Sequence, residues 1–221
     1  MELTAKFDLH VHSNSSLDSN LESDEIVRLA EIRGLRGVAI TDHNEVFDCD
    51  GRAGGRILVI PGIEVRTKSY EIIGLFVTER ITGSDPLEVI DRIHSCSGVS
   101  VLPHPYSLLR TPRGGDATLQ ELASKVDAIE VFNSRNLAIS QNKKANALAD
   151  RSHRSKVAGS DAHTPGEIGR AFTLMRDVEN IDDVRTRIIK GDTWCEGSLS
   201  PLTVHLATLL TKIRNMRKRP G

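Results

Sequence analysis

Histidines and carboxylates recur in this chain at the points where short apolar segments end. An apolar, β-prone set, Phe7, Leu9 and Val11, leads into a Ser- and Asn-rich loop, so a strand is expected to end near His10 and His12. Residues i and i+2 of a strand share a face, and two imidazoles on one face can bind the same metal ion. Such a pair alone is weak evidence, because about as many pairs are surface or core residues as are ligands.

Later apolar segments end in the same kind of residue. In a parallel barrel the carboxyl ends of the strands converge on one rim, which is where barrel enzymes have their active sites. We therefore expect a metal site at the C-terminal rim of the strands. The residues at these ends are Asp42, His43, Glu64, His104, Asn133, Asp161 and His163.

The types of these residues limit the choice of metal. Imidazole and carboxylate without thiolate favour Zn²⁺, Mn²⁺ or Fe²⁺. The candidate ligands outnumber those of one tetrahedral ion, which implies two or three ions, and the carboxylate of Glu64 can bridge two of them. Glu71 begins the next strand segment, and if residues 67–69 form a tight connection, a hairpin brings Glu71 near Glu64.

Strand and helix patterns alternate along the 221 residues. About seven strand segments with helices between them indicate an α/β fold, either a βα barrel or a doubly wound sheet. No repeat or linker divides the chain, and its length suits one substantial domain. Helices are expected near residues 24–33, 86–97, 119–125, 138–151, 181–190 and 202–218.

Composition excludes several other classes of protein. The 29 basic and 30 acidic residues nearly cancel, so any attraction to phosphate must be local, and 4% aromatic residues argue against a base-stacking surface. Cys49, Cys96 and Cys195 are widely spaced, which indicates reduced thiols and neither a disulfide framework nor a thiolate zinc site. With no leader pattern or long apolar segment, we expect a cytoplasmic protein with no membrane partner.

Five motifs together identify a family resemblance. The motifs HVHS, TDHN, PGIE, LPHP and GSDAH, in this order, resemble the PHP (polymerase and histidinol phosphatase) family over residues 5–175. The segments EIIGLFV, IEVFNSRN and GSDAHTPGEIGRAFT are similar to stand-alone PHP phosphoesterases with a PHP-associated C-terminal segment, including the 5′-nucleotidase and 5′–3′ exonuclease type. The resemblance implies a distorted seven-stranded (β/α)7 barrel with up to three metal ions at its rim. Residues 1–200 would form this domain, and 201–221 a basic C-terminal helix or tail.

The resemblance also implies a ligand set, with one departure. Where related exonuclease-type proteins have a histidine before the I-G-L segment, this chain has Glu71, which would be a ligand of the second ion or only a salt-bridge partner in the hairpin. Carried over by motif, the first ion would bind His10, His12, Glu64 and Asp161, the second Glu64 and His104, and the third Asp18, His43 and His163.

The implied activity is hydrolysis of a phosphomonoester, or of the terminal phosphodiester of a nucleotide or oligonucleotide, by metal-activated hydroxide. Its partner would be a small phosphoester or a short nucleic-acid end; the oligomeric state stays open. Glu64, Asp161 and His163 would act through the metals, and Asp42 would orient a ligand or serve only as a turn residue. Arg135 is the first candidate for the phosphate clamp, because its planar fork matches phosphate. Further candidates are Asn133, Arg110 and Arg113.

Alternative functions remain at this point. They are a histidinol-phosphate-type phosphatase, an amidohydrolase-like C–N hydrolase and a non-catalytic, metal-stabilised binding module. Glu64 stands where C–N hydrolases commonly have a bridging lysine, which ranks that alternative low. The basic helix near the C-terminus is expected to pack on its own domain, with a nucleic-acid or membrane-surface contact as the alternative.

Overall fold

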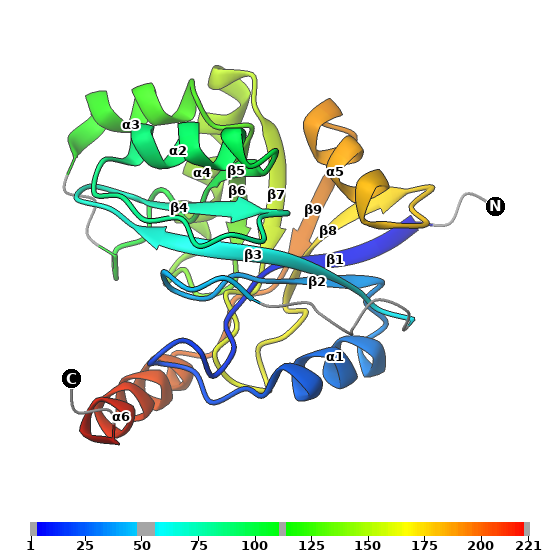
Figure 1. The fold of residues 1–221 in the computed structure, drawn as a ribbon, viewed down its shortest axis with the longest axis vertical. Helices are drawn as coiled ribbons and strands as arrows, with labels where there is room; N and C mark the ends of the chain where they lie inside the picture. Colours follow the sequence, from blue (N-terminus) through cyan, green and yellow to red (C-terminus); the bar gives the residue numbers. More distant parts are fainter. Residues whose placement is uncertain (1–3, 48–55, 111–113, 219–221) are drawn as a thin grey trace.

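One β-sheet runs through the computed structural model, which describes residues 4–47, 56–110 and 114–218 (Figure 1). Its nine strands are β1 (Thr4–Val11), β2 (Gly37–Ile40), β3 (Leu58–Arg66), β4 (Glu71–Leu75), β5 (Val99–Leu102), β6 (Ala128–Asn133), β7 (Ser155–Gly159), β8 (Ala171–Arg176) and β9 (Trp194–Gly197). Their order in the sheet is β7-β6-β5-β4-β3-β2-β1-β8-β9, so strands adjacent in the chain are mostly neighbours.

The sheet curls until it is nearly closed into a barrel. Val11 and Ala162 form a parallel bridge, which joins the segment after β7 to the end of β1. Two backbone hydrogen bonds hold this contact: the N–H of His12 donates to the carbonyl of Ala162 at 2.9 Å, and that of Asp161 to the carbonyl of His10 at 2.7 Å. The ends of β1 and β7 therefore lie side by side.

The expected seven-stranded (β/α)7 barrel is wrong in strand number and direction. β4 is antiparallel to both β3 and β5, and β8 is antiparallel to β1 and β9. The connection between β3 and β4 has only residues 67–70, which is too short for the crossover that parallel strands need. β9 was missed because it is short and largely exposed and shows no apolar alternation.

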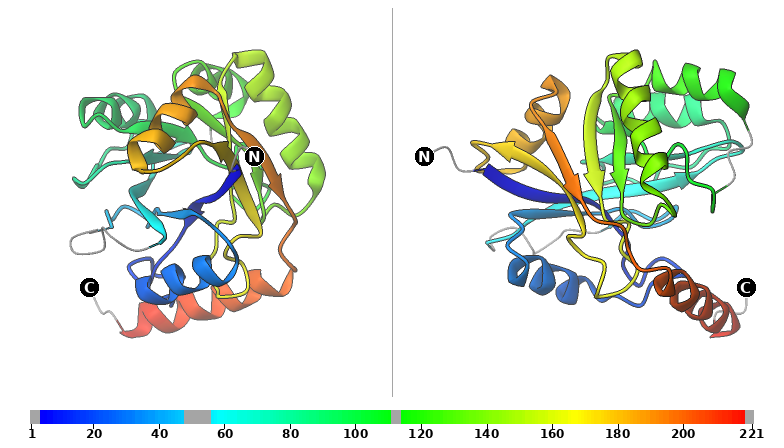
Figure 2. Two further views of the ribbon diagram at one scale, coloured as in Figure 1. Left: turned by 90° about the vertical axis from the view of Figure 1, so that its right-hand side faces the viewer. Right: turned by 180° about the vertical axis from the view of Figure 1, so that it is seen from behind.

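Helices cover the sheet on two sides. The helices of the described chain are α1 (Ser23–Ile32), α2 (Pro86–Ser95), α3 (Gly115–Ala123), α4 (Ile139–Ser152), α5 (Ile181–Lys190) and α6 (Thr203–Lys218). α2, α3 and α4 lie over the β4 to β7 part of the sheet, and α1 lies on the other side, against β2 (Figures 1 and 2). α3 begins earlier than predicted, because Asp116 suits the first turn of a helix although its glycine neighbours indicate a loop.

The core is built from the apolar faces of these elements. On α2, Val89, Ile90 and Ile93 are buried at helical spacing and pack toward β4 and β5. Ile26 and Ala30 of α1 form a second cluster with the strand residues on that side. Each fully buried branched side chain contributes about 1.5–3 kcal/mol. The two clusters hold the strands from both faces and leave their ends free to carry polar residues.

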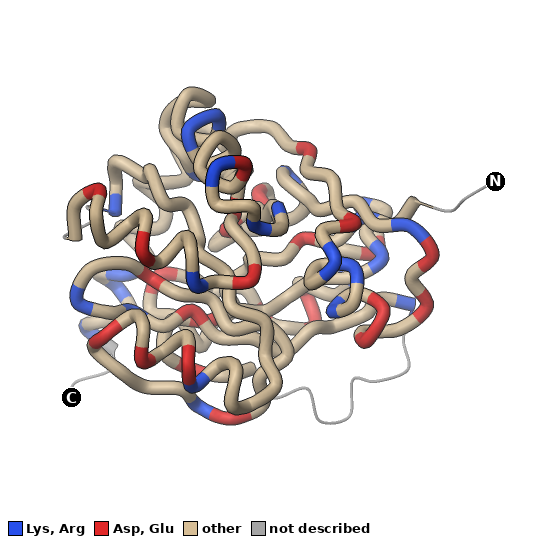
Figure 3. Tube along the Cα trace, turned by 90° about the horizontal axis from the view of Figure 1, so that it is seen from above, with Lys and Arg blue, Asp and Glu red and all other residues tan. Residues whose placement is uncertain are grey.

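The C-terminal helix α6 lies beside the ends of the strands and contacts the loop that follows β1 (Figure 2). The side-chain amide of Asn215 donates to the carbonyl of Leu17 at 3.0 Å. Basic and acidic residues lie interspersed along the chain in the view of Figure 3. In the described part of the chain, no helix combines the length and apolarity needed to cross a bilayer. Cys96 and Cys195 are free thiols, and Cys49 lies outside the described residues.

Candidate metal centre

The strand ends bring a first group of candidate ligands together. His10 and His12, at the end of β1, are buried, and their Nε2 atoms lie 3.1 Å apart. Asp161 Oδ1 lies 3.6 Å from His10 Nε2 and 3.3 Å from His12 Nε2. Glu64 Oε1 lies 3.5 Å from His10 Nε2, and Glu64 Oε2 lies 3.5 Å from His12 Nε2. Ligand bonds of about 2.1 Å in a tetrahedron place ligand atoms roughly 3.4 Å apart, so this first group has the spacing of one ion's ligands.

A second group lies around the other side of Glu64. His104 follows β5, and its Nε2 lies 3.0 Å from Glu64 Oε1 and 3.7 Å from Glu71 Oε2. The β3–β4 hairpin pairs Arg66 with Glu71, which confirms the predicted hairpin and brings Glu71 to the same side as Glu64. Glu64, shared by the two groups, is placed to bridge them.

The third group consists of Asp18, His43 and His163. Asp18 Oδ2 lies 3.6 Å from His43 Nε2, and Asp18 Oδ1 lies 3.5 Å from His163 Nε2. The ring of His12 lies beside both imidazoles, with centroid distances of 4.4 Å to His43 and 4.2 Å to His163. All nine residues expected to bind metal from the sequence therefore lie around one centre.

Unpartnered atoms show that this centre fits metal ions. Asp18 Oδ1 and His43 Nε2 are buried and have no hydrogen-bond partner among the described residues. Buried polar atoms are almost always satisfied in native proteins, so such atoms gathered at one place indicate a missing cation. The donor set of imidazoles and carboxylates is that of Zn²⁺, Mn²⁺ or Fe²⁺ sites.

Two of the ligand histidines have pKa values shifted in opposite directions. Burial lowers the pKa of His12, and so do the neighbouring rings of His163 and His43, which keeps the imidazole neutral as a metal ligand must be. Burial also disfavours charge on His43, but Glu64 and Asp18 raise its pKa to about 9. Because a metal ligand must be a neutral imidazole, binding of an ion in the third group would displace the proton from His43.

Two ligands follow their strands in a strained backbone conformation. His104 has φ +28° and Asp161 has φ +56°, in the left-handed region that non-glycine residues rarely adopt. Such residues cost about 1–3 kcal/mol each and cluster at functional sites. The turn places each side chain back over the strand ends.

Glu130, in the middle of β6, supports the ligands and was missed in the sequence. Its Oε1 lies 3.0 Å from His10 Nδ1, while its Oε2 accepts from the backbone N–H of His104 at 2.8 Å and from Asn133 Nδ2 at 3.0 Å. One carboxylate thereby orients a residue of the first group and one of the second. The signal was a single acidic residue in the apolar segment AIEVF.

Asp42 reaches the centre through a serine. It accepts hydrogen bonds from Ser13 and from the hydroxyl of Ser16, at 2.6 Å for the latter. The Ser16 hydroxyl lies 3.2 Å from His12 Nδ1 and accepts from the backbone N–H of His43 at 3.1 Å. Asp42 therefore lies behind the ligands and is placed to orient them.

Asp8 is a second buried acid that was not predicted from the sequence. It accepts from the backbone and hydroxyl of Ser160 and from the backbone N–H of Gly169 at 2.7 Å, so it holds the segment between β7 and β8 against β1. Burial raises its pKa to about 6, although these hydrogen bonds act in the other direction. Its signal was an acid between Phe7 and Leu9, beside the histidine pair.

The candidate phosphate-binding residues divide between two places. Arg135 is buried beneath α6, where its Nη2 donates to Thr208 Oγ1 at 2.8 Å, its Nε lies 3.6 Å from Glu167 Oε1, and its Nη1 has no partner among the described residues. Asn133 donates from Nδ2 to Asp161 Oδ2 at 3.2 Å and accepts from the backbone of Arg135.

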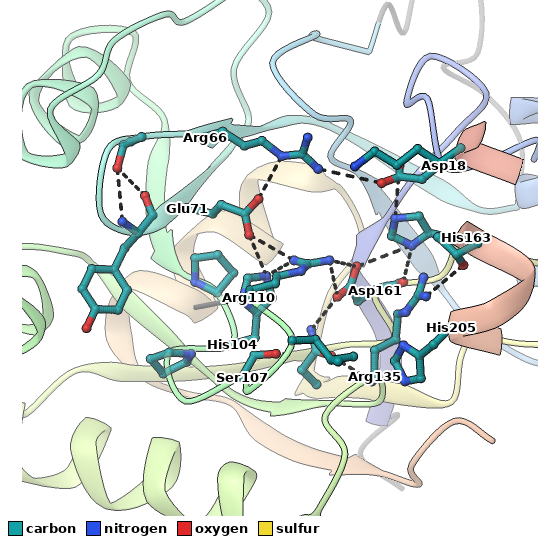
Figure 4. Close-up of a pocket in the computed structure, with 18 of the residues that line it drawn as sticks. Asp18, Arg66, Glu71, His104, Ser107, Arg110, Arg135, Asp161, His163 and His205 are labelled. Carbon is teal, nitrogen blue, oxygen red and sulfur yellow. Dashed lines mark hydrogen bonds and ion pairs between the residues drawn. The ribbon is translucent and has the colours of Figure 1, made fainter. Parts of the chain in front are cut away.

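Arg110 was expected to face a phosphate group. Its guanidinium instead contacts the candidate ligands Glu64, Glu71 and Asp161 (Figure 4). Arg113 lies outside the described residues.

A pocket of about 650 Å³ opens over the centre. Its floor carries ligands of all three groups, and one wall is formed by α6 (Figure 4). The residues that α6 contributes to this wall are His205, Thr208, Leu209 and Lys212. A helix far along the chain thus completes the site that the strand ends begin.

Comparison with known proteins identifies relatives of the sequence and of the fold. Residues 140–193 match the PHP-associated family. The uncharacterized protein MJ0417 of Methanocaldococcus jannaschii is 35% identical over 185 residues, which cover 81% of this chain and 75% of that protein.

Two solved structures have a similar fold. One is a two-domain protein containing a predicted PHP-like metal-dependent phosphoesterase from Bacteroides vulgatus, with a TM-score of 0.63 and 18% identity over 95% of this chain and 70% of the other. The second is the lesion-specific endonuclease PfuEndoQ of Pyrococcus furiosus, with a TM-score of 0.65 and 15% identity over 99% of this chain and 72% of the other. Together with the PHP-associated match and the archaeal relative, they lead to one conclusion: this chain belongs to the PHP family.

Proposed function

We propose that this chain is a metal-dependent phosphoesterase that hydrolyses a phosphomonoester, or the terminal phosphodiester of a nucleotide or short oligonucleotide. The observation that carries the proposal is the buried guanidinium of Arg135, whose Nη1 has no partner in the described chain and which lines the same pocket as the ligand groups. A guanidinium fork beside divalent metal ligands suits a phosphoryl group, whose oxygens carry the charge in the transition state.

The three ligand groups described above would hold two or three ions of Zn²⁺, Mn²⁺ or Fe²⁺. When bound, these ions lower the pKa of water near the phosphorus and neutralise phosphoryl oxygens. Glu64 would be shared between ions, because its Oε1 lies near His10 and His104 and its Oε2 near His12 and His43. Glu71 would either join the second group or serve only its arginine partners.

The residues behind the ligands would keep them in place during turnover. Glu130 holds the ring of His10 through its Nδ1, so that Nε2 faces the centre. Asn133 links Asp161 to the backbone of Arg135, which ties the proposed clamp to the first group. Arg135 would bind the phosphoryl oxygens from the α6 side of the pocket. Positioning of this kind is a large part of catalysis in phosphoryl transfer.

The form of the pocket supports a small substrate or a strand end. The wall formed by α6 limits the opening above the ligands, and about 650 Å³ is within the range of small-molecule sites. PfuEndoQ, with a similar fold, is a lesion-specific endonuclease, which supports a nucleic-acid or nucleotide phosphoester as the substrate class. The histidinol-phosphate type remains the alternative that the experiment must separate.

The test combines metal analysis with a panel of phosphoesters. Purified protein would be assayed with p-nitrophenyl phosphate and its bis ester, histidinol phosphate, 5′- and 3′-nucleotides, and short RNA and DNA. We expect bound divalent metal and turnover of nucleotides or of oligonucleotide ends. Preference for histidinol phosphate would overturn the substrate class, and inactivity on the whole panel with metals bound would favour a binding module.

A ligand variant shows whether the cluster does the chemistry. Because Glu64 belongs to two groups, Glu64→Gln is expected to lower kcat by more than about a hundredfold, beyond the typical loss from residues behind a metal ligand. The matched control is Glu88→Gln, a half-exposed acid paired with Arg92 on α2. Unchanged turnover in Glu64→Gln would show that the proposed cluster is not catalytic.

A further inference from the structure

Arg110 brings a positive charge into the middle of the second ligand group. Its Nη1 lies 3.2 Å from Glu64 Oε1 and 3.3 Å from Glu71 Oε2. The same nitrogen contacts His104 Nε2. Its Nη2 lies 2.9 Å from Asp161 Oδ2, so the guanidinium spans the second and first groups (Figure 4).

These contacts use the same atoms that a second metal ion would need. A second metal ion would use the lone pair of His104 Nε2 and an oxygen of Glu64. Arg110 Nη1 donates to that oxygen of Glu64 and contacts that nitrogen of His104. A lone pair cannot serve an N–H donor and a metal ion at once, so the two cations exclude each other.

The carboxylates around this position favour a cation, whether it is the guanidinium or a metal ion. Burial disfavours charge on Arg110, but the carboxylates of Asp161, Glu71 and Glu64 raise its pKa well above the usual range. The guanidinium thus stays charged and partly compensates the acidic cluster, as a metal ion would with its larger charge.

The position of Arg110 in the chain allows it to leave. Its side chain is 26% exposed, in contrast to the fully buried Glu64. The preceding residues, Leu108 and Leu109, are 74% and 53% exposed, so movement of this segment uncovers little additional apolar surface. The cost of removing the guanidinium is therefore mainly that of its ion pairs.

We propose that Arg110 is a built-in competitor of the second metal ion: the guanidinium and the ion take the same place between Glu64, Glu71 and His104. The proposal rests on the metal centre of the proposed function and deepens it. At low metal concentration the chain holds ions in the first and third groups with Arg110 in the second. The last ion binds only when the Arg110 side chain leaves this position. Glu71, where the chain departs from the family pattern, is a carboxylate that pairs with Arg110 here.

Calorimetric titration of the metal-free full-length chain with Mn²⁺ tests this competition. In wild type we expect a last ion that binds more weakly than the others. Arg110→Gln removes the competing charge. The last ion should then bind at least about tenfold tighter, because its binding no longer requires the ion pairs of Arg110 to break. Arg110→Lys keeps a charge without the planar fork and should give an intermediate affinity.

The matched control is Lys68→Gln. Lys68 lines the same pocket but pairs with Asp85 instead of a candidate ligand, so its loss should leave the titration unchanged. Equal stoichiometry and affinities in wild type and Arg110→Gln would overturn the proposal, and so would weaker binding of the last ion in the variant. If Arg110→Gln fails to fold by circular dichroism, Arg110→Lys decides in the same way.

This readout is separate from that of the proposed function. A chain that hydrolyses phosphoesters but shows no effect of Arg110 on metal binding would contradict only the competition. A chain that shows the effect of Arg110 but hydrolyses no member of the panel would contradict only the phosphoesterase. A chain that binds no Mn²⁺ at all would overturn the proposed competition, whatever its activity on the phosphoester panel.

Discussion

On the β1 side of the metal centre the ligands are buried and held from behind, whereas on the β4 side they face the pocket. His10 and His12 are 1% and 0% exposed, and Glu130 and Ser16 hold the ring nitrogens that point away from the centre. By contrast, the side chains of Glu71 and Arg110 are 16% and 26% exposed. We infer from this difference that the β1 side holds its ligands rigidly. The β4 side, in our proposal, exchanges cations or binds substrate.

The close approach of β7 to β1 gives the sharpest test of the rigid side. A Cβ at Gly159 would lie 2.3 Å from His10 Cβ and 2.7 Å from its backbone nitrogen, so Gly159→Ala must move β1. We expect a loss of about 3 kcal/mol in the free energy of unfolding, measured in urea, with weaker metal binding. Gly166→Ala, where nothing lies within 4 Å, is the control. Equal stability of the two variants would mean that the two strands are not tightly packed here.

The next largest effect is expected when one carboxylate is replaced on each side of the centre. Glu130→Ala removes the acceptor for His10 Nδ1 and for the His104 backbone, and we expect metal affinity to fall by about 10–100-fold. Glu71→Ala, on the open side, should change it by less than about tenfold, because arginines are its main partners. Metal titration of the two variants measures both effects. Equal losses would remove the distinction between the sides.

The substrate side is tested at Arg135. Arg135→Lys keeps the charge but loses the planar fork, and we expect KM to rise by about tenfold with kcat little changed. Steady-state kinetics on the best substrate of the panel measures both constants. Lys68→Arg, at an exposed lysine of the same pocket that pairs with Asp85, is the control. An unchanged KM in Arg135→Lys would move the phosphate clamp to another residue.

The smallest expected effect concerns the support that α6 gives to Arg135. Thr208→Val removes the acceptor of the Arg135 Nη2 hydrogen bond, which is worth about 1 kcal/mol, so KM should rise by no more than about fivefold. Thr211→Val, on the same helix, loses only a hydrogen bond from Asn20 and should leave KM unchanged. The same KM in both variants would show that α6 does not position the arginine.

Much of the centre could be predicted because ligands at strand ends leave a clear local pattern. An apolar segment followed by His or Asp reveals both the strand and the end at which the side chain lies, as at His43 and His104. The supports Glu130 and Asp8 could not be recognised in this way, because each lies within an apolar segment and resembles a lone polar residue of a core. Their role depends on partners 120 and 152 residues away, His10 and Ser160.

The sequence by itself determined the types of ligand, their places at the ends of strands and the hairpin that carries Glu71, because side-chain chemistry and strand periodicity are local. Only the tertiary structure decided that the sheet has nine mixed strands, that α6 closes one wall of the pocket, and that Arg110 enters the ligand cluster. These features depend on how the sheet curls and on which distant segments then meet. Local patterns carry no information about that closure, which is set by packing of the whole chain.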